Sequence, residues 1–163
     1  MPDWVTHIAV AYILCTVIGF KYRQFNTSNT VLAMMGAVLP DVVKLGLIGE
    51  FLGYEVWNQI WAVHLPVGTL IIAGMVSLFF QDKRTAFLFF VLGAATHYTL
   101  DLLTFNVSGG IALLYPIYWG EWQLDLFTTE NFYVPIVVLA VAVLTYLISR
   151  RMAKKGSKEA AAD

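Results

Sequence analysis

All three histidines of this 163-residue chain, His7, His64 and His97, lie in or beside strongly apolar segments, and so do Asp41 and Asp101. Imidazole nitrogens and carboxylate oxygens are ligands of Zn²⁺, and also of Mn²⁺ and Fe²⁺. A charged group at the centre of a membrane costs about 2.5 to 3.5 kcal/mol on insertion scales, so each of these side chains requires a partner or a function. We therefore predict that the five side chains bind a divalent metal, with zinc favoured over manganese or iron.

The spacing within this set supports a shared site. His97 and Asp101 are four residues apart, which on a helix places both side chains on one face with Cβ atoms about 5 to 6 Å apart. The alternative is that Asp101 only orients His97. Asp41 follows Pro40, and a proline inside an apolar helix predicts a kink with carbonyl groups left free nearby. Lys44, one turn later, either neutralises Asp41, which is the simpler interpretation, or contacts an anionic group of a substrate.

The segments that position these residues are predicted to be transmembrane helices. The chain is 59% hydrophobic and 13% charged, against about 25% charged in soluble domains, which excludes a water-soluble fold. Its apolar blocks approach membrane-spanning length and lack the alternation of strands. We predict an all-α bundle of about five transmembrane helices in residues 1–150 and a polar, disordered cytoplasmic tail in residues 151–163. The predicted spans are 4–20, 31–48, 65–80, 86–105 and 132–148.

The basic residues predict the orientation. Nine of the ten would lie on one side of the membrane, in the first and third connections and in the tail. The opposite side receives the N-terminus and the loops 50–63 and 106–131, which contain no lysine or arginine. By the positive-inside rule, the N-terminus faces out and the C-terminus faces the cytoplasm. The chain is thus expected to be a multi-pass plasma-membrane protein whose five ligand candidates lie toward the extracytoplasmic side.

On several short segments the chain resembles the membrane-bound metal-dependent hydrolase family of bacteria and archaea. The resemblance covers nearly the whole chain and includes the single residue His64. The matching segments are PDWVTH ending at His7, GAVLPD ending at Asp41, GAATHYTLD ending at Asp101, and LYP ending at Pro116. The order of these residues also resembles, more distantly, that of the zinc-dependent phospholipase C and nuclease superfamily. No histidine follows His97, which departs from the three-metal pattern of that superfamily.

These resemblances imply metal ligation by the same five residues, with Asp41 or Asp101 as a catalytic ligand or general base. They imply a membrane-embedded hydrolase of a phosphoester, carried by a lipid or a lipid-linked substrate, at the extracytoplasmic face. Lys44 and Tyr115 are further candidates for contacting the substrate. The expected partners are membrane lipid and the lipid phosphate substrate, and no nucleic acid is expected.

Two other functions remain open from the sequence. The same histidines and aspartates would serve a transporter or metal-uptake protein if polar groups continued to the cytoplasmic side, but the inner halves of the spans offer only scattered hydroxyls. In a non-catalytic structural protein, the polar residues would hold helices together through hydrogen bonds worth about 0.6 kcal/mol each. The substrate, the number of metal ions and the oligomeric state do not follow from the sequence.

Overall fold

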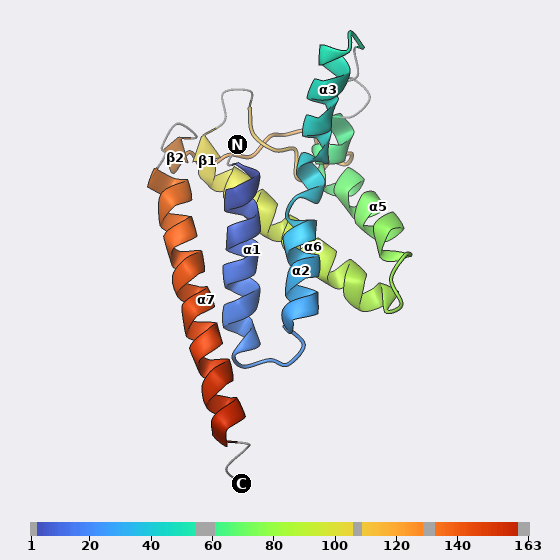
Figure 1. Cartoon of the computed structure of the whole chain (residues 1–163). Helices are drawn as coiled ribbons and strands as arrows, with labels where there is room; N and C mark the ends of the chain where they lie inside the picture. Colours follow the sequence, from blue (N-terminus) through green and yellow to red (C-terminus); the bar gives the residue numbers. More distant parts are fainter. Residues whose placement is uncertain (1–2, 55–60, 106–108, 129–132, 160–163) are drawn as a thin grey trace.

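A computed structural model describes residues 3–54, 61–105, 109–128 and 133–159, which form a mostly helical structure (Figure 1). Most helices are α-helices, but two short segments beside the candidate site are 3₁₀-helices. The elements in chain order are α1 (Trp4–Gly19), α2 (Thr27–Gly36), η1 (Leu39–Leu45), α3 (Gly46–Phe51), η2 (Trp61–His64), α5 (Pro66–Ser77), α6 (Lys83–Leu103), β1 (Thr104–Phe105), β2 (Phe127–Thr128) and α7 (Tyr133–Glu159).

The helical fold class is confirmed, but five spans are not. Two described helices are long and apolar enough to cross a membrane, α6 and the Tyr133–Lys154 part of α7. A third span results if α2 and the segment Leu39–Phe51, which are bent by 47°, count as one. The other two predicted spans correspond to α1 and to α5, whose 12 residues reach only about 18 Å of the roughly 30 Å hydrocarbon core. The number of spans and the orientation therefore stay predictions. In the two loops without basic residues, residues 55–60, 106–108 and 129–131 lie outside the described residues.

The bend predicted at Pro40 is present. Pro40 stands in the first turn of η1, where it has no N–H to donate to a preceding carbonyl. The Asp41 N–H donates to the carbonyl of Val38, three residues back, at 3.0 Å, instead of to the carbonyl of Ala37, four residues back, as in an α-helix. The chain thereby leaves the Ala37 carbonyl available to a partner from another helix.

Two glycines, Gly36 and Gly93, let α2 and α6 cross in close contact. A Cβ atom on Gly93 would lie 1.9 Å from the Ala33 carbonyl oxygen, and one on Gly36 would lie 2.3 Å from the Phe90 carbonyl oxygen. Only a residue without a side chain permits this approach. The crossing places the next turn of α6, which carries His97, beside the break between α2 and η1.

Aspartate side chains cap the starts of two helices. The Asp3 carboxylate accepts hydrogen bonds from the Thr6 N–H at 2.8 Å and from its hydroxyl at 2.9 Å, so α1 begins at Trp4 and His7 falls in its first turns. Asp82 caps α6, and its hydrogen bonds from Thr85 hold the pKa of this exposed carboxyl below its usual range.

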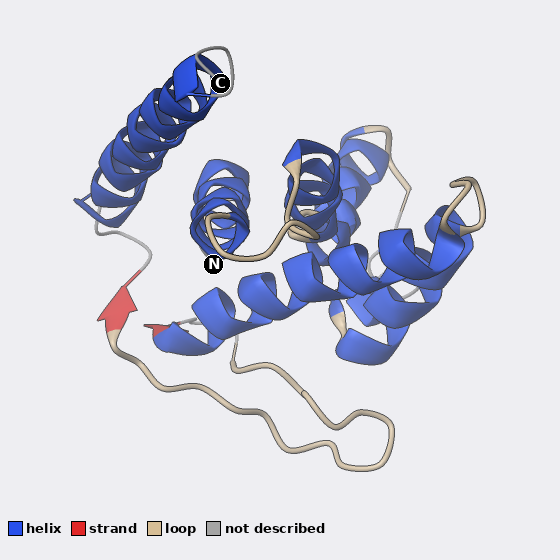
Figure 2. Cartoon of the chain, turned by 90° about the horizontal axis from the view of Figure 1, so that it is seen from below, coloured by secondary structure: helices blue, strands red, loops and turns tan. Residues whose placement is uncertain are grey.

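The last helix lies along α1 and stands apart from α5 and α6 (Figures 1 and 2). It continues to Glu159, beyond the boundary predicted at residue 150, so residues 151–159 are helical where a disordered tail was expected. The alanine, lysine and arginine residues of this segment are good helix formers, which accounts for the extension. Residues 160–163 lie outside the described residues.

Candidate metal centre

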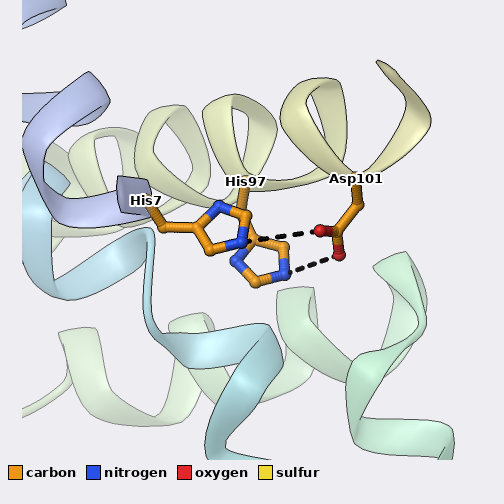
Figure 3. Close-up of side chains that lie close together, drawn as sticks. All are labelled: His7, His97 and Asp101. Atoms are coloured by element: carbon orange, nitrogen blue, oxygen red, sulfur yellow. Dashed lines mark ion pairs between the residues drawn. The ribbon is translucent and has the colours of Figure 1, made fainter. Parts of the chain in front are cut away.

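The five predicted ligands come together from four helical segments. His7 comes from α1, Asp41 from η1 and His64 from η2, while His97 and Asp101 come from adjacent turns of α6. Figure 3 shows His7 and His97 directed toward the Asp101 carboxylate. The Nε2 atoms of His7, His64 and His97 lie 3.5, 3.4 and 3.1 Å from an Asp101 oxygen. Asp41 Oδ1 completes the cluster at 3.8 Å from His64 Nδ1 and 4.0 Å from His97 Nε2.

The cluster is buried and its polar atoms are unsatisfied. The side chains of His7, Asp41 and His97 have no exposed surface, and that of Asp101 is 2% exposed. Buried polar atoms nearly always have hydrogen-bond partners in folded proteins. Within the described residues, the buried side-chain atoms that lack one all belong to these five residues. They are His7 Nδ1 and Nε2, Asp41 Oδ1, His64 Nε2, His97 Nε2, and Asp101 Oδ1 and Oδ2.

The distances fit metal ligands better than direct ion pairs. A charge-assisted hydrogen bond between nitrogen and a carboxylate oxygen measures about 2.7 to 2.9 Å, which is shorter than every histidine–aspartate distance in the cluster. Ligand atoms placed ~2.0 to 2.1 Å from a tetrahedral zinc ion lie ~3.3 to 3.4 Å apart. The separations of 3.1, 3.4 and 3.5 Å around Asp101 are close to that value. The donor set and its spacing therefore fit a divalent cation.

Backbone carbonyls orient two of the three rings. His97 Nδ1 lies 2.8 Å from the Ala37 carbonyl oxygen, and His64 Nδ1 lies 3.1 Å from that of Pro40. A carbonyl oxygen only accepts, so each Nδ1 carries the hydrogen and each Nε2 presents its lone pair to the cluster. Metal-binding histidines almost always donate their other N–H in this way. The carbonyls come from the bend at Pro40, which the sequence predicted to leave acceptors free near Asp41.

The ligand atoms form two overlapping groups. One comprises His7, His97 and Asp101, and the other comprises Asp41, His64 and His97. His97 belongs to both, and its ring also stacks on that of His7 with centroids 3.8 Å apart. Because a ring nitrogen binds one ion, the two groups cannot both be complete at the same time.

The two candidate substrate contacts have different surroundings. Lys44 Nζ donates a hydrogen bond to Asp41 Oδ2, as expected of a counter-ion, and its side chain is 27% exposed. Tyr115 packs against Trp61 and Trp119, with ring centroids 5.8 and 4.7 Å away. Its predicted contact with a substrate stays a prediction.

Two hydroxyl groups beside the cluster were missed by the sequence analysis. The Tyr98 hydroxyl donates to the His64 carbonyl at 3.1 Å and lies 2.6 Å from Thr69 Oγ1, while Thr69 Oγ1 donates to the Val63 carbonyl at 2.9 Å. Together they hold the short turn that carries His64. The sequence signal that could have identified them was their position, since Tyr98 follows His97 and Thr69 lies three residues after Pro66. Polar residues at similar depth in a membrane bundle tend to contact one another.

We expect Tyr98→Phe to weaken zinc binding by about 10-fold, the lower end of the loss seen when a group supporting a metal ligand is removed. The ring remains, so the helix should still pack, but His64 loses an anchor. Zinc affinity measured by competition with a chromogenic chelator checks this. Tyr12→Phe, which removes a hydroxyl from the cavity between α1, α2 and α7, is the control. Equal affinities in the two variants would show that the Tyr98 hydroxyl does not position His64.

Comparison with known proteins gives one match. The family model described as YdjM inner membrane protein matches residues 1–162. No curated protein and no solved structure matches the chain. The match supports the assignment of this chain as a plasma-membrane protein. It carries no information about metal binding or hydrolysis.

Proposed function

Because the chain belongs to the YdjM inner membrane protein family and gathers five metal-ligand side chains in one buried cluster, we propose that it is a membrane-embedded, metal-dependent hydrolase. Its substrate is a phosphoester of a lipid or a lipid-linked molecule, hydrolysed at the extracytoplasmic face. The observation that carries the proposal is the concentration of unsatisfied buried nitrogen and oxygen atoms in this cluster and, among the described residues, nowhere else. Their types and spacing match a site for one or two zinc-like ions.

A bound zinc ion would lower the pKa of its water to about 7 and would stabilise negative charge on phosphoryl oxygens. His7, His97 and Asp101 would hold it, since their ligand atoms lie within 4.8 Å of one another and the Nε2 atoms of His7 and His97 lie 3.5 and 3.1 Å from an Asp101 oxygen. His64, whose Nε2 lies 3.4 Å from Asp101 Oδ2, would be a further ligand. Asp41 keeps Oδ1 directed at the histidines and Oδ2 on Lys44. Either Asp41 or Asp101 would accept the proton that the attacking water releases.

The charge of the cluster favours an anionic substrate. With neutral histidines, the two carboxylates and the Lys44 ammonium give −2 + 1 = −1, and one divalent ion changes this to +1. In a buried site of low dielectric, that excess attracts a phosphate group. Lys44, the counter-ion of Asp41, is more exposed than any residue of the cluster and would contact the phosphoryl oxygens first.

The experiment is a hydrolysis assay on detergent-purified protein loaded with zinc. We expect release of inorganic phosphate from phosphatidic acid, loss of this release after treatment with a strong chelator, and recovery when zinc is restored. Chelation should also lower the melting temperature, because an ion present at 100 times its dissociation constant stabilises the folded state by about 2.7 kcal/mol.

Two outcomes would contradict the proposal in different ways. Protein that holds stoichiometric metal but hydrolyses no lipid phosphate would refute the hydrolase and leave a metal protein. A melting temperature that does not respond to the chelator would refute the metal centre and favour a purely structural role for the polar residues.

A further inference from the structure

Two apolar pockets lie where α5 faces the bent segment of α2, η1 and α3, and several of their lining residues are next to predicted metal ligands in the chain. The first, about 360 Å³, lies between η1, α3 and α5 and is lined by Val43, Val63 and Ile72 among others. The second, about 430 Å³, lies between α2 and α5 and is lined by Ile8 and Val76 among others. Val42 lines both pockets, so they are adjacent.

Residues that line the pockets are next to three of the predicted ligands in the chain. Val42 follows Asp41, Ile8 follows His7, and Val63 precedes His64. Ile72 and Val76 are one turn apart on α5, and each lines one pocket. The residue shared by both pockets, Val42, thus directly follows Asp41 in η1.

The two most exposed residues at the centre, Lys44 and His64, are chain neighbours of residues that line the first pocket. The side chains of Lys44 and His64 are 27% and 13% exposed, whereas those of the other four predicted ligands are 0 to 2% exposed. Lys44 lies between Val43 and Leu45, which both line the first pocket. A molecule reaching the metal centre past Lys44 would therefore carry its remaining part over the apolar pockets.

We infer that these two pockets bind the hydrocarbon chain of a lipid phosphate whose anionic head group lies at Lys44 and the metal centre. The inference rests on the proposed function and adds where the apolar part of the substrate binds. The occupant is a lipid because the pockets are apolar, the adjoining group is cationic, and the chain belongs to an inner membrane family. For a ligand that binds from water, burying a hydrocarbon chain in such pockets is favourable in proportion to the area buried.

The test compares phosphates that share a head group and differ in chain length. Zinc-loaded full-length protein in a fixed concentration of detergent is titrated calorimetrically with inorganic phosphate and with ethyl, hexyl and octyl phosphate. We expect affinity to rise from ethyl to octyl phosphate by up to about fourfold per methylene. Equal affinity for inorganic and octyl phosphate would overturn the inference, because the site would then bind the phosphate group alone.

Variants that fill a pocket test where the hydrocarbon chain binds. Val42→Trp, at the wall shared by both pockets and 38% exposed, should remove the gain from ethyl to octyl phosphate and leave ethyl phosphate binding intact. Ile72→Phe fills the first pocket from α5 and is the second variant if Val42→Trp does not fold. Ile71→Trp, on the same helix, 59% exposed and outside both linings, is the control and should retain the gain.

The outcomes separate this inference from the proposed function. If the affinity still rises from ethyl to octyl phosphate in both pocket variants, the inference is overturned. Hydrolysis of lipid and short-chain phosphates at equal rates would do the same while the proposed function stands. Chain-length-dependent binding without hydrolysis would refute the proposed function and support the lipid site.

Discussion

Replacing His97 with alanine is expected to abolish stoichiometric zinc binding and, with it, metal-dependent hydrolysis. His97 is the one residue present in both candidate ligand groups, so its loss leaves neither group complete. Removal of a residue that merely supports a ligand costs about 10- to 100-fold in metal affinity, and loss of the ligand itself should cost more than 100-fold. Elemental analysis of purified wild-type and His97→Ala protein, together with phosphate release from phosphatidic acid, measures both effects.

The control for this variant lies on the same helix. Thr99 is exposed, and its hydroxyl only donates to the Ala95 carbonyl one turn back, so Thr99→Ala should bind zinc as the wild type does. His97→Ala must also elute as a folded species in detergent, since His97 is fully buried. A folded His97→Ala protein that keeps one equivalent of zinc would contradict the assignment of this residue as a ligand.

Gly93→Ala should destabilise the folded protein by at least about 3 kcal/mol, at the upper end of the cost of inserting a methyl group into a packed core. The added Cβ would lie 1.9 Å from the Ala33 carbonyl oxygen, 2.6 Å from the Ala37 nitrogen and 2.8 Å from the Gly36 carbonyl carbon. These are backbone atoms, which cannot move aside as a flexible side chain can. The two helices must separate, and the separation also moves His97 away from the Ala37 carbonyl.

A second helical glycine provides a matched comparison. A Cβ on Gly74 in α5 would have the Phe87 Cε2 atom 4.0 Å away as its nearest contact, so Gly74→Ala should be neutral or gain about 0.5 to 1 kcal/mol of helix stability. Unfolding in detergent with increasing denaturant compares both variants with the wild type. Equal stability of the Gly93 and Gly74 variants would show that α2 and α6 do not cross as closely as described.

The parts of the site that follow local rules could be predicted from the sequence. The four-residue spacing of His97 and Asp101 places them on one face of any helix, and the cost of a polar group in lipid requires such residues to find one another. Pro40 predicts the bend because it cannot donate the helical hydrogen bond. The small residues at 36 and 93 predict a close crossing for a similar local reason.

The parts that depend on contacts between distant segments could not be predicted. The Ala37 carbonyl meets His97 across 60 residues, and the Pro40 carbonyl meets His64 across 24 residues. The sequence shows that these carbonyls are free but not which ring reaches them. The shortness of α5 was hidden because its apolar block continues to residue 80, beyond the end of the helix at Ser77. Metal binding, the number of spans and the orientation in the membrane stay predictions.

The use of main-chain oxygens to hold the two rings has a consequence for mutational screens. A carbonyl group remains when Ala37 or Pro40 is exchanged for another residue, so scanning mutagenesis would not register either acceptor directly. Only a change in the backbone conformation, or an ester in place of the amide at these positions, would weaken the hydrogen bonds from the imidazoles to these carbonyls. Relatives could therefore differ in side chains at these two positions and still orient their histidines alike, provided that the break in the helix is kept.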